Sequence, residues 1–138
     1  MPIKCSTKTK VIVYIKLNET SKITLWLHRD ERGYDDGELI DYLLLNSQFE
    51  LNGKCYNTKK DYSDIMYDED SGLRWFVMRW DHYTKDGDNF KIAIDARTIA
   101  THTTIDCCID GKEYDANDMD SDKTIAHIQA VLDSQEDL

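Results

Sequence analysis

Apolar and polar residues alternate over several segments of this chain, a pattern that predicts a protein built largely of β-strands. The clearest alternation covers residues 90–94, where Phe90, Ile92 and Ile94 share the side expected to face a core. Residues 11–15 are apolar on both sides and predict a buried central strand. Further strands are expected in the segments 23–27, 49–51, 54–56, 73–80 and 99–109.

Two stretches show the spacing of a helix instead. Leu39, Tyr42 and Leu43 would share one face of a helix over residues 36–46, which an aspartate at its start can cap. A second apolar stripe, made by Ile125, Ile128 and Leu132, predicts a helix over residues 120–134. Asp120 or Ser121 is the expected cap of this second helix.

The order of these elements indicates the fold class. Asn52-Gly53 and Asp110-Gly111 are strong signals for tight hairpin turns, and strands do not alternate regularly with helices. We therefore expect an α+β fold, with a mainly antiparallel sheet of about five to seven strands and two helices. Residues 1–138 are expected to form one domain, with a flexible acidic loop at 58–72 and a frayed C-terminus at 135–138.

Composition narrows the class of protein. The chain has 41% hydrophobic and 32% charged residues, which is typical of a globular domain. It has no run of 18 apolar residues and no apolar segment behind its first lysines, so neither a membrane span nor a secretory signal is expected. The four cysteines are expected to be reduced, and the expected location is cytoplasmic, in the encoding organism or in a host that the protein enters.

Charge is distributed unevenly along the chain. Residues 1–60 carry 10 Lys/Arg and 8 Asp/Glu, a balance of +2, whereas residues 61–138 carry 7 and 19, a balance of −12. This acidity argues against direct binding of nucleic acid, because phosphate contacts need clustered lysines and arginines. The basic residues near the start of the chain are expected to protect a strand edge.

Tyrosines accompany the acidic residues, and this combination suits a basic partner protein, because charge steers the encounter and tyrosines supply contact area. We expect an interaction module, not an enzyme, whose carboxylates occupy a basic surface; its strongest form is an inhibitor that mimics nucleic acid. Small acidic counter-defence proteins of phages are similar in composition. The same charge would also simply keep the domain soluble, and a homodimer is compatible with the sequence. The candidate partner-binding residues are Asp61, Tyr62, Asp64, Tyr67, Asp68, Glu69, Asp70, Tyr114, Asp115, Asp118, Asp120 and Asp122.

The aromatic residues between 74 and 97 raise a second hypothesis, the binding or sequestering of a nucleotide. Aromatic rings stack on bases, and arginines pair with phosphates. The competing interpretation is that a small domain needs these rings for its core. The candidate ligand-binding residues are Arg74, Trp75, Arg79, Trp80, Tyr83 and Arg97.

No motif names a reaction. The segment that starts at Asp118 begins like a calcium loop, but Lys123 replaces the glycine of the turn and Gln129 replaces the bidentate glutamate. Cys107 and Cys108 are adjacent, so on a strand they would point to opposite faces and could not hold one zinc ion together. We therefore expect no cofactor and no metal, and an enzyme with a metal in its carboxylate loops is the least favoured alternative.

Overall fold

The alternating segments fold into two antiparallel sheets rather than one. The computed structural model describes residues 7–34, 37–57, 62–68, 73–81, 87–95 and 103–136. Within this part of the chain the strand order is β1-β2-β3-β4 in the first sheet and β5-β6-β7-β8-β9 in the second. The fold is still α+β, but the expectation of a single sheet with five to seven strands and two helices is wrong, because the described residues form nine strands and one α-helix.

The first sheet is a meander of hairpins. The turn between β3 and β4 is the predicted Asn52-Gly53 pair, with φ angles of 50° and 82°. Positive φ at both residues is what a two-residue turn with the twist of the flanking strands requires. The strands of this sheet are β1 (Thr7–Asn18), β2 (Ser21–Tyr34), β3 (Gly37–Leu51) and β4 (Lys54–Asn57).

The helix predicted over residues 36–46 does not form, because β3 runs through this segment from residue 37. Its backbone pairs with β2 along nearly its whole length, and Tyr42 lies opposite Arg29. Tyr42 is buried whereas Leu43 is exposed, which is the alternation of a strand. Hydrogen bonding to a long neighbouring strand has overridden a short apolar pattern that also fits a helix.

The segment 11–15 is a strand, as predicted, but it is not central. β1 lies at an edge of its sheet, and Ile12 and Tyr14 are exposed on its outer side. Only one side of β1 faces the core, where Val13 is buried. Apolar residues on both sides of a strand therefore do not mark a central position here.

The second sheet contains the predicted strands at 73–80 and 90–94. A strand also forms at 62–68, inside the segment predicted as a loop, because this segment pairs with β6. The long strand predicted at 99–109 is observed from Thr103 onward, and residues 99–102 lie outside the described part. The strands are β5 (Tyr62–Asp68), β6 (Leu73–Asp81), β7 (Asn89–Asp95), β8 (Thr103–Ile109) and β9 (Lys112–Asp115).

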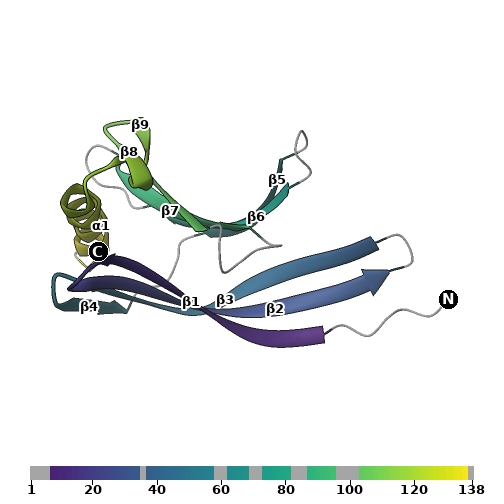
Figure 1. Ribbon diagram of the computed structural model, residues 1–138. Helices are drawn as coiled ribbons and strands as arrows, with labels where there is room; N and C mark the ends of the chain where they lie inside the picture. Colours follow the sequence, from purple (N-terminus) through teal and green to yellow (C-terminus); the bar gives the residue numbers. More distant parts are fainter. Residues whose placement is uncertain are drawn as a thin grey trace.

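The C-terminal helix closes one end of the two sheets (Figure 1). A 3-10 turn, η1 (Ala116–Asp118), leads into α1 (Ser121–Glu136), which confirms the helix predicted at 120–134. The backbone N–H of Asp122 donates to Oδ1 of Asp120 at 3.0 Å, so Asp120 is the cap. The helix ends at residue 136. Among the described residues, no helix has the length and apolarity to cross a bilayer.

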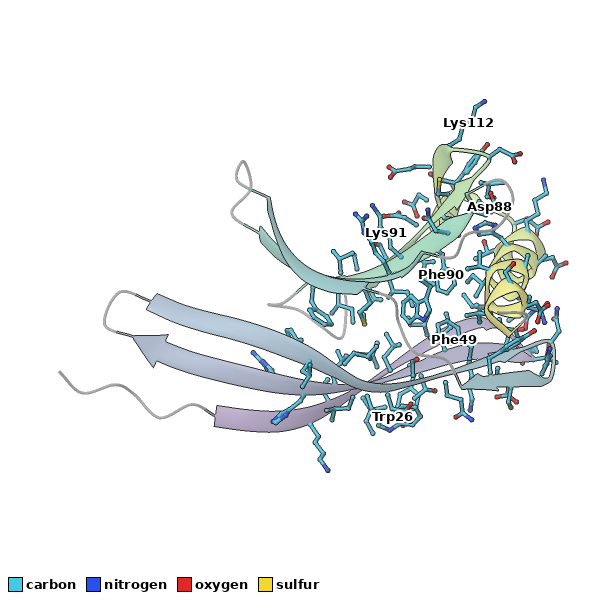
Figure 2. All side chains as sticks on the ribbon, turned by 180° about the vertical axis from the view of Figure 1, so that it is seen from behind. Trp26, Phe49, Asp88, Phe90, Lys91 and Lys112 are labelled. Atoms are coloured by element: carbon cyan, nitrogen blue, oxygen red, sulfur yellow. The ribbon has the colours of Figure 1, made fainter. Side chains whose placement is uncertain are left out.

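Between the sheets lies one continuous core, to which α1 contributes four fully or almost fully buried residues: Ile125, Ile128, Val131 and Leu132. At its centre Phe49 from β3 meets Trp80 from β6 and Phe90 from β7. Figure 2 shows Phe49 and Phe90 pointing toward each other from opposite sheets. These rings join the two sheets, because each sheet alone would leave its apolar face in water.

Candidate functional site

Six carboxylates are exposed together around the β8–β9 hairpin and the start of α1, and we call this set the acidic surface. The stretch 110–122 that carries them contains one lysine, which gives a local balance of −5. The strands, η1 and the first turn of α1 follow one another without a long connection, so the carboxylates are kept close along the chain. The acidic surface consists of Asp110, Glu113, Asp115, Asp118, Asp120 and Asp122.

Local geometry explains why these residues are acidic and why they face solvent. Asp110 has a φ angle of 51° and Gly111 has 78°, so the pair forms the predicted turn and projects away from the sheet. The N–H of Asp110 donates to Oδ1 of Asp88 at 2.9 Å, which brings a further carboxylate beside the hairpin. Asp120 and Asp122 lie at the N-terminus of α1, where the helix dipole favours negative charge.

Tyr114 is an exposed aromatic residue of the same hairpin. It lies on β9, opposite Cys107 of β8, and it is exposed. β9 is an edge strand of the second sheet. Because successive residues of a strand point to opposite faces, Tyr114 points away from Glu113 and Asp115, and the tyrosine does not share one face of the hairpin with these two carboxylates.

The other predicted acidic segment lies elsewhere in the fold. Tyr62, Asp64, Tyr67 and Asp68 belong to β5, of which only the backbone is described, while Asp61, Glu69 and Asp70 lie outside the described residues. β5 and β9 are the opposite edges of the five-stranded sheet. Four strand spacings separate them, about 19 Å. The structure therefore gathers the candidates from 114 to 122 but does not place β5 beside them.

A small cleft beside the acidic surface contains three charged residues that the sequence did not single out, Lys91, Asp106 and Glu113. Nζ of Lys91 lies 3.7 Å from Oδ2 of Asp106 and 4.0 Å from Oε1 of Glu113, so one ammonium group faces two carboxylates. Burial raises the pKa of Asp106, although Lys91 opposes this effect. The alternation along β7 buries Phe90 and Ile92, so the sequence could have placed Lys91 on the opposite side of the sheet, away from the core. The cleft has a volume of about 90 Å³ and is lined by Arg79, Asn89, Lys91, Asp106, Cys107, Cys108 and Glu113.

The thiol of Cys107 is not prepared for nucleophilic chemistry. Cys107 is buried, and burial raises the pKa of its thiol to about 12. A thiol attacks as the thiolate, so Cys107 is inert near neutral pH. Among the described residues, no three His, Cys, Asp or Glu side chains converge in a way that could hold a metal ion. The carboxylates are instead spread over the surface.

The candidate residues for a nucleotide are not gathered into one described pocket. Trp80 is completely buried and its ring stacks on Phe90 at a centroid distance of 4.9 Å, so it offers no surface to a ligand. Arg79 lines the cleft beside Lys91. Arg74 and Trp75 lie on β6 with only their backbone described, and Tyr83 and Arg97 lie outside the described residues.

Comparisons with known protein families, with curated proteins and with solved structures find no match to this chain. The function is therefore inferred from the chain's own residues.

Proposed function

We propose that this protein is an acidic interaction module that uses the acidic surface to occupy a basic, nucleic-acid-binding surface on another protein. The observation that supports the proposal is the local balance of −5 over residues 110–122, on carboxylates that are all exposed. A partner that normally holds phosphates supplies lysines and arginines, and carboxylates spread over a surface can take the place of those phosphates.

The contacts of the acidic surface favour the binding of a partner over a role confined to stabilising the fold. Asp120 accepts the helix-capping hydrogen bond, and Lys91 lies near Glu113. The carboxylates of Asp118 and Asp122 make neither of these two contacts. Asp118 lies on η1, and Asp122 takes part in the cap only through its backbone N–H. Their carboxylates face solvent and remain available to a basic partner.

The test removes two of these charges without disturbing the fold. Asp118→Asn combined with Asp122→Asn should weaken binding to a basic partner by about two- to thirty-fold, if each exposed ion pair contributes about 0.2–1 kcal/mol. The matched control is Glu19→Gln with Glu50→Gln, which removes the same charge from the β1–β2 turn and from β3, where Glu19 lies 3.2 Å from Lys16 and Glu50 lies 3.9 Å from Lys22.

The assay uses each variant, immobilised on a resin, to capture proteins from a cell lysate at about 50 mM salt. Captured proteins should be basic, should elute at about 500 mM salt, and should be displaced by a DNA duplex of about 20 base pairs. If DNA does not compete, the partner surface is not one that holds nucleic acid. If the control variant loses the same proteins, overall charge and not the acidic surface is responsible, and the proposal fails.

A further inference from the structure

A cavity lies between the two sheets beside the start of α1, next to the acidic surface. It has a volume of about 230 Å³. One wall belongs to β1 of the first sheet and another to β8 of the second, while η1 and α1 supply the third. The helix α1 contacts both of these strands (Figure 1). The apolar residues of the wall are Ile15, Leu17, Ile105, Ala116 and Met119.

The cavity is large enough for one bulky side chain of a partner protein. An engineered protein cavity of about 150 Å³ takes up benzene. A cavity of about 230 Å³ therefore has room for an aromatic ring that carries a polar group, such as the phenol ring of a tyrosine.

The wall of the cavity is mixed in character. Its apolar residues come from both sheets, whereas Thr103, Ser121 and Thr124 add side chains with hydroxyl groups. Thr124 is buried, and its Oγ1 donates to the backbone oxygen of Asp120 at 3.2 Å. A wall of this kind suits a side chain that is apolar on its faces and polar at its end, which is the character of tyrosine and tryptophan.

The charge around the cavity indicates which residues would flank such a ring. Residues 116–124, which include the η1 and α1 wall, carry three aspartates and one lysine, a balance of −2. The three aspartates are exposed members of the acidic surface: Asp118, Asp120 and Asp122. On the β1 wall, Nζ of Lys16 lies 3.2 Å from Oε1 of Glu19, so this pair adds no net charge. Basic residues beside the ring would therefore be complementary to the surroundings of the cavity.

We infer that the cavity takes an aromatic side chain with a polar end from the basic partner, and that lysines or arginines of the same segment lie over the acidic surface. This inference rests on the proposed function and names what the partner must present. Exposed ion pairs alone contribute little to affinity. A ring buried in a pocket and surrounded by weaker contacts is typical of the residues that dominate a protein interface. The cavity would therefore give the acidic surface its specificity.

The test uses two synthetic peptides with blocked ends, Lys-Arg-Lys-Tyr-Lys-Arg-Lys and the same sequence with Ala in place of Tyr. NMR titration of the full-length protein at about 50 mM salt gives both affinities. The Tyr peptide should bind about tenfold or more tightly, because burial of its ring adds to the charge contacts that the two peptides share. It should also shift the methyl signal of Met119, which lines the cavity, but not that of the completely buried Met78.

A cavity-filling variant and its matched control separate the cavity from the charge. Ala116→Leu enlarges a side chain of the cavity wall, so it should remove the advantage of the Tyr peptide and leave the Ala peptide unchanged. Ala126→Leu makes the same change at an exposed position of α1 and should keep the advantage. Asp118→Asn with Asp122→Asn should weaken both peptides alike, so that the ratio of their affinities stays the same.

Each result supports or overturns the inference. It is overturned if neither peptide binds, if both bind equally, if the Tyr peptide leaves the Met119 signal in place, or if its advantage survives Ala116→Leu. If the Ala peptide binds through Asp118 and Asp122 but the tyrosine adds nothing, the proposed function stands and only this inference fails. If removal of the two aspartates affects neither peptide, the proposed function is contradicted as well. Self-association in ultracentrifugation that Ala116→Leu abolishes also overturns the inference, because a second copy would then occupy the cavity.

Discussion

The contact between Phe49 and Phe90 should stabilise the protein by joining its two sheets. The ring centroids lie 5.7 Å apart with an interplanar angle of 72°, an edge-to-face arrangement, and both side chains are completely buried. Such a pair contributes about 0.5–1.5 kcal/mol beyond the burial of area. Each ring also contacts Trp80, so a leucine at either position loses two ring contacts.

A double-mutant cycle isolates this contact. Phe49→Leu and Phe90→Leu should each lower the free energy of unfolding by about 1–4 kcal/mol, from lost ring contacts and imperfect repacking. The double variant should be less destabilised than the sum by about 0.5–1.5 kcal/mol, because the contact can be lost only once. Urea unfolding followed by far-UV circular dichroism gives all four free energies.

The control for the cycle is Leu43→Ala, which lies on the same strand as Phe49 but on the side that points away from the core. Leu43 is mostly exposed, so its removal should change stability by about 0.5 kcal/mol or less and should show no coupling to Phe90→Leu. A coupling between Phe49 and Phe90 within about 0.3 kcal/mol of zero, with both single variants destabilised, would refute the packing of one sheet on the other at this point.

Two further predictions concern a turn and a titrating group. Gly111→Ala should lower the free energy of unfolding by about 1–2 kcal/mol, because a φ of 78° is unfavourable for a residue with a Cβ. No atom lies within 4 Å of the added carbon, so the backbone angle alone should cause this loss. An unchanged urea midpoint would contradict this prediction. Burial raises the pKa of Asp106 above its ordinary value of 3.8, so the folded state binds this proton more tightly than the unfolded state. The stability of the wild type relative to Asp106→Asn should therefore fall as the pH rises from about 3.5 through the raised pKa toward 7, and a rise over that interval in paired urea titrations would disprove the assignment.

The candidate site could be predicted from the sequence only where its residues lie close together along the chain. Asp110-Gly111, Tyr114 and the acidic start of α1 are neighbours along the chain, so their proximity follows from a turn and a helix cap. The distance between this group and β5 depends on the order of five strands, which no local pattern specifies. The ion pairs of Lys91 with Asp106 and Glu113 likewise need three strands in register.

The exposure of apolar residues on β1 could not be predicted from the sequence for a related reason. Val11 to Ile15 is apolar on both sides, and a buried central strand was the expected cause. In the structure β1 is an edge strand with one apolar side exposed. Burial depends on what packs against each face, which is a property of the whole fold and not of the strand.

By itself the sequence determined the hairpin turns, the C-terminal helix and the side of β7 that enters the core. Each depends on backbone preference or on spacing within a few residues, as in Asn52-Gly53 and in the stripe of Ile125, Ile128 and Leu132. Only the tertiary structure decided that residues 37–46 form a strand and that the strands divide into two sheets. Those outcomes depend on hydrogen bonds between distant segments and on aromatic packing between the sheets, whose free energy outweighs local preference.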